Sequence, residues 1–323
     1  AYWRKGTVMI PSTTLLSIIM PIQAFMPSSS FVSTTATRKI TRVAQRRYPI
    51  LPCMDTQYTI NDSICPPLDE TELKDTVQKR CETLETFLTK RPIAGHTQAA
   101  FDQIIPHIQP DSKIILDSGC GTARSTLILG EMYPDHTIIG IDRSIIRLSK
   151  NKIGKEQALK ENRASEEEDD ELPFNVVASN VILVRADLTD FWRCCLDAEW
   201  KISKHFLLYP NPCPKKKVFK NRWYAHPSFP LILKLGGEIL IRSNWEGYLK
   251  EFSKSVGYAH DFYSNQKAVN FALPYLEDAR SGPVERLDKT IALTNFEMKY
   301  DACGERTYEL LLQRRNESSN STS

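Results

Sequence analysis

The sequence lacks the residue spacing of a metal site or of a disulfide framework. Its 323 residues include eight cysteines but no CxxC pair, and no cluster of His and Cys stands at the spacing of metal ligands. We therefore expect no bound metal and a reducing compartment. The adjacent Cys194 and Cys195 are expected to pack as small hydrophobic residues.

A strong net charge is also missing. The formal net charge is +3, which is too small to indicate a nucleic-acid-binding protein by itself. The charges are unevenly placed, because residues 1–54 contain no Asp or Glu, residues 166–171 are all acidic, and residues 215–222 carry five Lys or Arg. Local patches are therefore more informative than the total.

The N-terminal segment has no long hydrophobic run. Its apolar stretch at residues 15–20 is too short to span a bilayer and lies in a Ser/Thr-rich segment without acidic residues. Residues 22–27 (IQAFMP) resemble the alanine–phenylalanine junction of two-part plastid leaders. We expect residues 1–54 to be a targeting leader for a plastid, with a mitochondrial address or a disordered cytosolic tail as alternatives, and we expect no membrane partner.

An alternating strand and helix pattern follows a helical N-terminal extension at residues 55–112. Helices are predicted over residues 68–91 and 97–108, the second with Thr97 as its N-cap. Residues 113–314 then alternate between apolar strands and amphipathic helices, which predicts an α/β domain with a mostly parallel sheet and helices on both faces. Strands are predicted at 114–116, 137–141, 181–184, 205–209, 238–242 and 308–313, and helices at 124–133, 144–160, 228–235 and 245–256. The acidic tract near 163–173 is predicted to be an exposed insertion, and residues 315–323 a disordered tail.

A glycine-rich turn follows the first strand of this domain. Gly119 and Gly121 let the backbone approach a ligand closely, and the N-terminus of the next helix supplies free amide groups. Asp142 closes the second strand, where a ribose diol would lie, and Asp187 closes the third, where its carboxylate is placed to accept from an adenine amino group. These features predict a nucleotide-type cofactor at the carboxyl ends of the strands.

Two classes of cofactor contain such a nucleotide. A dinucleotide-binding turn prefers a third glycine, but Arg124 stands at that position. S-adenosylmethionine carries a positive sulfonium and no phosphate, so that Asp117 beside the turn would attract it rather than repel it. We therefore favour a methyltransferase over a dehydrogenase.

A second loop follows the strand at 205–209. Two prolines flank Asn211 and a third follows Cys213, so that residues 209–214 leave the strand as a stiff, kinked loop. The basic stretch 215–222 comes next, with Phe219, Trp223 and Tyr224 interleaved or adjacent. Its cations are predicted to contact RNA phosphates, and the aromatic side chains to stack on a base.

Five short motifs occur in a fixed order in this domain. They are residues 116–121 (LDxGxG), 140–142 (GxD), 209–216 (YPNPxPKK), 242–245 (RSNW) and 294–297 (TNFE). In this order they resemble the motifs of the tRNA (guanine-N7)-methyltransferases of the bacterial single-chain type. The resemblance implies a class I S-adenosylmethionine-dependent methyltransferase fold with a seven-stranded sheet. It also implies S-adenosylmethionine as methyl donor and guanine N7 in tRNA as acceptor, and we expect a monomer, with a partner chain left open.

The resemblance carries roles onto the matching positions. Asn211 corresponds to the position between cofactor and base, which implies the catalytic role for this residue. Cofactor contacts are implied for Asp117, Gly119, Gly121, Asp142, Asp187 and Asn211. Substrate contacts are implied for Lys215, Asn244, Thr294, Asn295, Phe296 and Glu297.

The chain departs from the family at four positions. Asn211 and Asn244 stand where the family has Asp, Cys213 where it has Trp, and Ala123 where it usually has Gly. Guanine N7 has an in-plane lone pair and no proton, so that its methylation needs positioning and electrostatics rather than a general base. We expect slower turnover or a changed substrate.

Two further functions stay open. Residues 211–214 (NPCP) also resemble the Asn-Pro-Pro-aromatic loop of methyltransferases that act on amino nitrogens, although Pro214 replaces the aromatic residue. The two lost carboxylates and the basic stretch are also compatible with a catalytically silent RNA-binding homologue. His96 and His226 are expected to be structural, and Asn244 has a second interpretation as the N-cap of the following helix.

Overall fold

The structure is a computed structural model that describes residues 67–108, 111–150, 175–178, 180–265, 280–281, 285–286 and 291–313. The expected leader at 1–54, the acidic insertion near 163–173 and the tail at 315–323 lie outside these residues. In the residues that the structure describes, no helix has the length and apolar character needed to cross a membrane.

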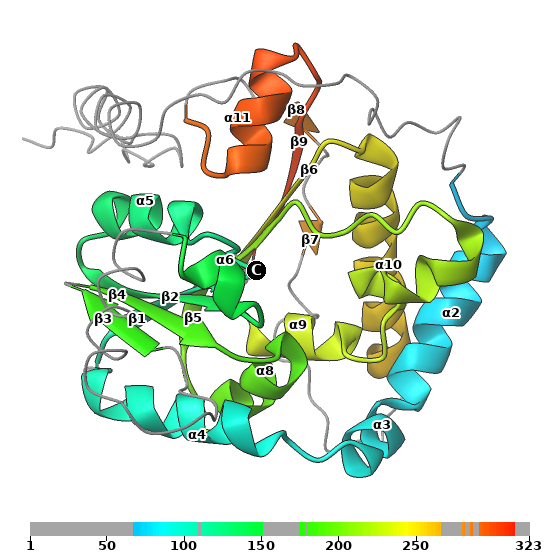
Figure 1. Ribbon diagram of the computed structural model, residues 1–323. Helices are drawn as coiled ribbons and strands as arrows, with labels where there is room; N and C mark the ends of the chain where they lie inside the picture. The colour runs from blue at the N-terminus through cyan, green and yellow to red at the C-terminus, as the bar shows by residue number, and fades with distance from the viewer. Residues whose placement is uncertain are drawn as a thin grey trace, which may run out of the picture.

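One mixed sheet forms the centre of the molecule (Figure 1). The described residues contribute nine strands in the order β3-β4-β2-β1-β5-β6-β9-β7, and β8 pairs with β9. β1, β2, β4, β5 and β6 are parallel, whereas β3, β7, β8 and β9 pair antiparallel with their neighbours. The strands are β1 (Lys113–Ser118), β2 (His136–Asp142), β3 (Asn175–Ala178), β4 (Val181–Arg185), β5 (Ile202–Leu208), β6 (Glu238–Ser243), β7 (Arg280–Ser281), β8 (Glu285–Arg286) and β9 (Tyr308–Gln313). The mostly parallel sheet is confirmed, but the described strand count is nine rather than seven.

Helices cover both faces of the sheet, as predicted. Because side chains alternate along a strand, Ile114 and Leu116 of β1 join one core and Ile115 joins the other. The first core is covered by α2 (Glu70–Glu82), α4 (Gly95–Ile104), α8 (Leu188–Asp197), α9 (Phe229–Leu235) and α10 (Glu246–Asn265). The second core is covered by α5 (Arg124–Met132) and α6 (Ile145–Leu148). In Figure 1, α5 lies above the sheet, α4 and α8 lie below it, and α2 packs beside α10.

Several helix boundaries differ from the predictions. The predicted helix 68–91 is broken at Thr83 into α2 and α3 (Leu84–Lys90), and Asp69 caps α2. α4 begins after Ala94, so that Thr97 is not its N-cap but a buried residue of its first turn. The short helices η1 (Ile105–His107), η2 (Lys216–Asn221) and η3 (Trp223–Ala225) and the helix α11 (Asn295–Ala302) complete the described elements.

Two other elements were predicted incompletely. α8 was not predicted, although Asp187, which was singled out for the cofactor, is its N-cap. α10 continues to Asn265, well beyond the predicted end at residue 256. The predicted helix 144–160 begins as α6, and its part beyond residue 150 lies outside the described residues.

The cysteines are mostly as expected. Cys194 and Cys195 are buried and free, as are Cys81 and Cys120, and Cys213 is free and half-buried. Cys303, which follows α11, is disulfide-bonded, which runs against the expectation of a reducing compartment and of cysteines outside any disulfide framework.

Candidate active site

The turn after β1 is held in a left-handed backbone conformation. Gly119, Gly121 and Ala123 have φ angles of +81°, +59° and +60°. The amides of Gly119 and Cys120 donate to the carbonyl oxygen of Ile141 at 2.8 and 3.0 Å, which ties the turn to the end of β2. A Cβ at Gly121 would meet no atom within 4 Å, so the φ angle and not space favours glycine there. The same conformation at Ala123 explains why glycine suits that position.

Asp117 faces α5 and not a ligand pocket. Its side chain is 1% exposed and accepts hydrogen bonds from the hydroxyls of Ser125 (2.6 Å) and Thr126 (2.7 Å). Burial raises the pKa of the Asp117 carboxyl to about 6, against the opposing effect of these two hydrogen bonds. The side chain of Asp117 therefore holds β1 against α5 and is engaged there, and not in the cofactor contact that the resemblance implies.

Asp142 lies at the carboxyl end of β2 with both carboxylate oxygens in use. Oδ2 accepts from the Gly121 amide (3.0 Å), and Oδ1 accepts from the Ser144 amide (2.8 Å) and from Arg147 Nη2 (2.8 Å). The Arg147 side chain is 51% exposed, whereas that of Asp142 is 3% exposed. A ribose diol that approaches Oδ1 must therefore displace a solvent-exposed guanidinium.

A pocket of about 190 Å³ opens beside this carboxylate. Gly119, Asp142 and Asp187, all implied as cofactor contacts, lie in its wall, but Asp117, Gly121 and Asn211 do not. The remaining wall residues are Arg143, Arg147, Leu188, Thr189 and Trp223, and none of these was assigned to the cofactor from the sequence. In the part of the chain that the structure describes, no three His, Cys, Asp or Glu side chains are grouped to hold a metal ion.

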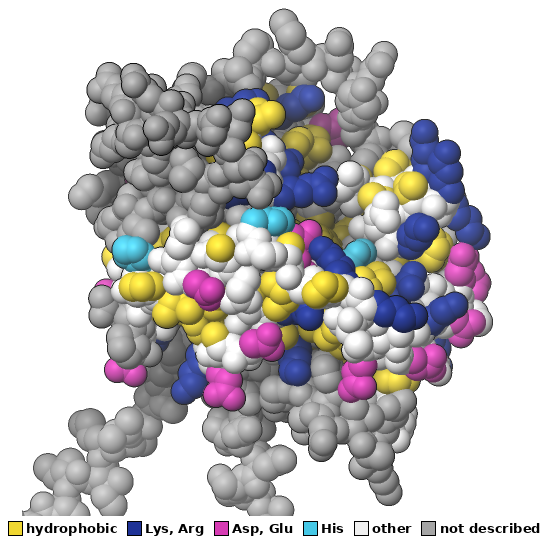
Figure 2. Space-filling model, turned by 60° about the horizontal axis from the view of Figure 1, so that its bottom comes forward, with side chains coloured by type: hydrophobic (Ala, Val, Ile, Leu, Met, Phe, Trp, Pro, Cys, Tyr) yellow, Lys and Arg dark blue, Asp and Glu magenta, His cyan; other side chains and the backbone are white. Residues whose placement is uncertain are grey.

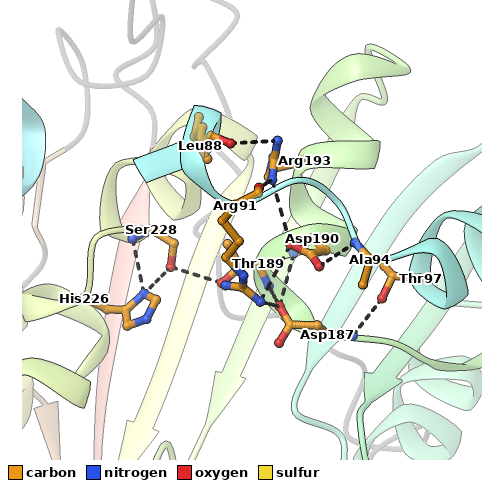
Figure 3. Close-up of polar contacts among 10 residues, drawn as sticks. All are labelled: Leu88, Arg91, Ala94, Thr97, Asp187, Thr189, Asp190, Arg193, His226 and Ser228. Carbon is orange, nitrogen blue, oxygen red and sulfur yellow. Dashed lines mark hydrogen bonds and ion pairs between the residues drawn. The ribbon is translucent and has the colours of Figure 1, made fainter. Parts of the chain in front are cut away.

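Asp187 is fixed by the turn between α3 and α4 (Figure 3). Its Oδ1 accepts from the amides of Thr189 (3.0 Å) and Asp190 (3.3 Å) and lies 2.9 Å from Arg91 Nη2. The Asp187 amide donates to the hydroxyl of Thr97 at 3.2 Å. The carboxylate is 35% exposed, so that it caps α8 and also faces the pocket.

The histidine beside this cluster is structural, as expected. His226 Nδ1 lies 2.7 Å from the Ser228 hydroxyl (Figure 3). The His226 ring also packs edge-on against Phe87 and Trp223. Burial lowers the pKa of His226 to about 4, so the ring is neutral at physiological pH. The His226 ring supports Trp223, which lies in the pocket wall.

The loop after β5 carries backbone strain on both sides of Asn211. Tyr209 and Cys213 have φ angles of +53° and +44°, and each such non-glycine residue costs roughly 1–2 kcal/mol. Asn211 is exposed, and its Oδ1 accepts from the Cys213 amide at 3.1 Å. Its amide nitrogen makes no hydrogen bond within the described residues. We call residues 209–214 the acceptor loop.

Arg222 supports the acceptor loop from inside the protein. Its Nε donates to the carbonyl oxygens of Pro212 (3.0 Å) and Cys213 (3.4 Å), and its guanidinium lies 4.7 Å from the Trp245 ring centroid. Arg222 Nη1 pairs with Glu251 at 2.9 Å. The prediction that Arg222 contacts RNA is therefore wrong, because its side chain is only 2% exposed.

The lysines of the same stretch lie outside. Lys215, Lys217 and Lys220 are exposed and make no ion pair within the described residues, whereas Lys216 pairs with Glu72 of α2 at 3.1 Å. Figure 2 shows Lys and Arg side chains gathered toward one side of the visible face, with Asp and Glu mostly along its lower part. The stretch thus offers three unpaired cations, and not five.

Asn244 lies at the end of β6, beside the acceptor loop. α10 begins at Glu246, and the Trp245 amide donates to the Ser243 hydroxyl at 3.1 Å, so that Asn244 is not the N-cap. The amide nitrogen of Asn244 is buried and has no hydrogen-bond partner in the described structure. Trp245, the next residue, is buried in the core.

The run 294–297 forms the start of α11. The Thr294 hydroxyl accepts from the Glu297 amide (3.1 Å), and Glu297 Oε2 accepts from the amides of Leu293 (2.7 Å) and Thr294 (3.4 Å), which is a capping box. Glu297 Oε1 also accepts from Arg242 Nη1 at 2.8 Å. The side chains of Thr294 and Glu297 thus fix the helix, and both are engaged within the protein.

The other two side chains of that run face different neighbours. Asn295 Nδ2 donates to the hydroxyl of Thr122 at 3.1 Å, which joins α11 to the glycine turn. Phe296 is 59% exposed, and its ring lies 6.5 Å from those of Tyr209 and Tyr300. The start of α11 therefore bridges the glycine turn and the acceptor loop.

A family model now relates this geometry to known proteins. The model of the methyltransferase family Methyltransf_4 matches residues 111–301. The chain belongs to this family. The resemblance to the tRNA (guanine-N7)-methyltransferases is thereby confirmed at the level of the family, and so is the class I methyltransferase fold.

Solved structures similar to this Methyltransf_4 chain are also methyltransferases. A structure titled "Structure of an Antibiotic Related Methyltransferase" is 15% identical, with 70% of this chain and 97% of that chain covered at a TM-score of 0.40. The 16S rRNA methyltransferase KamB is 13% identical, with coverages of 70% and 95% at a TM-score of 0.40. A mutant 16S rRNA (adenine(1408)-N(1))-methyltransferase from Catenulisporales acidiphilia is 13% identical. The match covers 63% of this chain and 85% of that chain at a TM-score of 0.32. No curated protein matches the chain.

Proposed function

We propose that this methyltransferase transfers a methyl group from S-adenosylmethionine to N7 of a guanine in tRNA. The observation that carries the proposal is the placement of three features at one edge of the sheet. These are the left-handed glycine turn after β1, the carboxylates of Asp142 and Asp187, and the strained acceptor loop after β5. Ligands of open α/β sheets bind at the carboxyl ends of the strands, where all three features lie.

The pocket residues suit the proposed donor. Asp142 and Asp187 supply two carboxylates to the wall, and Arg143 and Arg147 in the same wall balance their charge. The carboxylates therefore suit the donor as acceptors for its ribose hydroxyl and adenine amino groups. Trp223 and Leu188 supply apolar surface of the kind on which an adenine ring packs. When bound, S-adenosylmethionine supplies a methyl group on a positively charged sulfur.

The acceptor loop suits a substrate that needs no base. Guanine N7 attacks with a lone pair, so the loop has to orient the ring and to exclude water rather than to remove a proton. Asn211 is exposed, and its amide nitrogen is a donor for a base carbonyl such as O6. An amino-nitrogen acceptor is less suitable, because Asn211 Oδ1 is already engaged by the Cys213 amide.

The three unpaired lysines support an RNA acceptor. Lys215, Lys217 and Lys220 follow the acceptor loop directly, where phosphates beside the target base would pass. If each contacts one phosphate, the triple substitution to Gln should lower the slope of log affinity against log salt concentration by roughly 2. Lys201→Gln, an exposed change just before β5, is the matched control and should leave the slope unchanged.

One incubation tests the function. The full chain is supplied with S-adenosylmethionine and undermodified tRNA, and the digested nucleosides are identified by mass spectrometry. 7-Methylguanosine is the expected product. An amino-methylated nucleoside would support the second function considered above, and tRNA binding without any product would support a silent homologue.

We also propose a plastid location, which rests on residues 1–54 alone. A fusion of these residues to a fluorescent reporter should accumulate in plastids. A uniform cytosolic signal would contradict the proposal.

A further inference from the structure

Three aromatic rings stack against one another beside the acceptor loop. The ring centroids of Tyr209 and Tyr300 are 5.6 Å apart at an interplanar angle of 38°, and those of Phe296 and Tyr300 are 6.5 Å apart at 24°. Tyr209 and Phe296 are 6.5 Å apart at 30°. The three rings are thus closer to parallel than to perpendicular, and only Phe296 is strongly exposed among them, at 59%.

Both sides of this stack are fixed to the same arginine. The Tyr209 amide donates to the Arg242 carbonyl oxygen at 2.8 Å, and the Arg242 guanidinium pairs with Glu297 at 2.8 Å. Arg242 also pairs with Glu309 at 2.7 Å. Because Glu297 completes the capping box of α11, the helix that carries Phe296 and Tyr300 cannot shift freely relative to Tyr209.

The stack lies where a substrate ring would be needed. Tyr209 is two residues before Asn211, and Asn295, the neighbour of Phe296, contacts the glycine turn through Thr122 at 3.1 Å. The exposed ring of Phe296 is therefore next to a helix turn that joins the donor side to the acceptor side. A large exposed aromatic ring that is held rigidly at such a position offers a face for one more planar ring.

In the proposed reaction the aromatic face of Phe296 would also attract positive charge, in addition to stacking on the purine. The N7 lone pair forms the new N–C bond while the C–S bond breaks and its electron pair stays on sulfur. The positive charge thereby moves from the sulfonium to the purine, and no proton is transferred. Asn211 and Asn244, in the acceptor loop and beside it, are uncharged and supply no counter-charge to the product. An aromatic face also attracts a cation, through its quadrupole.

We propose that Phe296, backed by Tyr300 and Tyr209, binds the methyl-accepting purine and stabilises the positive charge that forms on it. The inference rests on the proposed function and deepens it, because it assigns the charge stabilisation to π faces instead of carboxylates. The ligand class is a purine that is cationic after alkylation.

Nucleotide binding tests the inference without turnover. Titrations of the full chain with 7-methylguanosine 5′-monophosphate and with GMP should show roughly 3- to 30-fold tighter binding of the cationic nucleotide. Phe296→Leu should abolish this preference, and Phe296→Trp should retain or increase it. Tyr133→Leu is the control, because Tyr133 packs against His136 at the opposite edge of the sheet.

Methylation of tRNA by the same variants separates this inference from the proposed function. Phe296→Leu should lower kcat by about the factor by which the wild type prefers the cationic nucleotide. The affinity for the methyl donor should stay unchanged. An unchanged nucleotide preference and an unchanged kcat in Phe296→Leu would overturn the inference while the function stands. Absence of 7-methylguanosine with the wild-type protein would instead overturn the function itself.

Discussion

Arg222 and Glu251 form an ion pair of 2.9 Å beneath the acceptor loop, with only 2% and 5% of their side chains exposed. Arg222 donates upward to the carbonyl oxygens of Pro212 and Cys213, and Glu251 accepts from the Leu68 amide at 2.6 Å. The hydroxyl of Tyr224 also bonds to Glu251. The loop that carries Asn211 is thus connected through two buried charges to the segment that precedes α2.

Removal of the arginine should affect both stability and catalysis. Arg222→Met leaves Glu251 buried without its counter-charge, which is expected to lower the free energy of unfolding by about 3–5 kcal/mol. Arg222→Lys keeps the charge but loses the planar guanidinium that donates to the loop carbonyls. It should therefore be more stable than Arg222→Met and still have a lower kcat than the wild type. Urea unfolding and single-turnover methylation measure the two effects. Lys220→Met, an exposed change, should alter stability by less than about 0.5 kcal/mol.

Arg147 should compete with the donor for Asp142. The Arg147–Asp142 pair at 2.8 Å is half-exposed, and its loss on ligand binding costs at most about 1 kcal/mol. Arg147→Met is therefore expected to tighten donor binding by roughly two- to fivefold. Calorimetry with S-adenosylhomocysteine measures this change. Lys150→Met removes a nearby exposed charge without breaking the pair, and an equal effect there would mean that charge alone is responsible.

Asp117 should make stability depend on pH. Burial raises its pKa in the folded protein to about 6, above the ordinary value in the unfolded chain. The folded state therefore holds the proton more tightly, and the stability contributed by Asp117 falls as pH rises from about 4 to about 6. The fall is on the order of 2–3 kcal/mol. Urea unfolding should show it in the wild type and in the exposed variant Asp111→Asn, but not in Asp117→Asn.

Ala123 should tolerate glycine better than another buried alanine does. Its left-handed backbone costs roughly 1–2 kcal/mol, which glycine relieves, while the lost buried methyl group and the added flexibility cost a similar amount. Ala123→Gly is expected to stay within about 0.5 kcal/mol of the wild type. Ala100→Gly, in the middle of α4, gains nothing and should lose about 1.5–2 kcal/mol. Equal losses at both positions would contradict the explanation.

Local pattern predicted six of the nine described strands but missed β3, β7 and β8, and it did not predict every helix. β9 was predicted at residues 308–313 because its apolar residues and its boundaries are local signals. α8 was missed because Asp187, its cap, was interpreted only as a ligand contact. The strand-end pattern predicted that Gly119, Asp142 and Asp187 lie together, and all three line one pocket. Asp117 instead binds the hydroxyls of Ser125 and Thr126 in α5.

Long-range partners explain the remaining differences. A run of basic residues gives no sign of which cation is buried, and Arg222 is buried because Glu251, 29 residues later, folds against it. Likewise, the spacing of Thr294 and Glu297 is a local capping signal, but the bond of Glu297 to Arg242 depends on β6, 55 residues earlier. Trp223 lines the pocket and packs against Trp192 and His226, and both of these contacts are made by tertiary packing.

The bond between the Leu68 amide and Glu251 limits how far the N-terminal part of this protein can be shortened. Truncation that ends before Leu68 leaves its N–H available to Glu251. Truncation beyond Leu68 would remove one hydrogen-bond donor from the Glu251 carboxylate directly below the acceptor loop. A processed form that begins inside α2 should therefore be folded less tightly and be catalytically impaired, even though every residue of the pocket and of residues 209–214 would still be present.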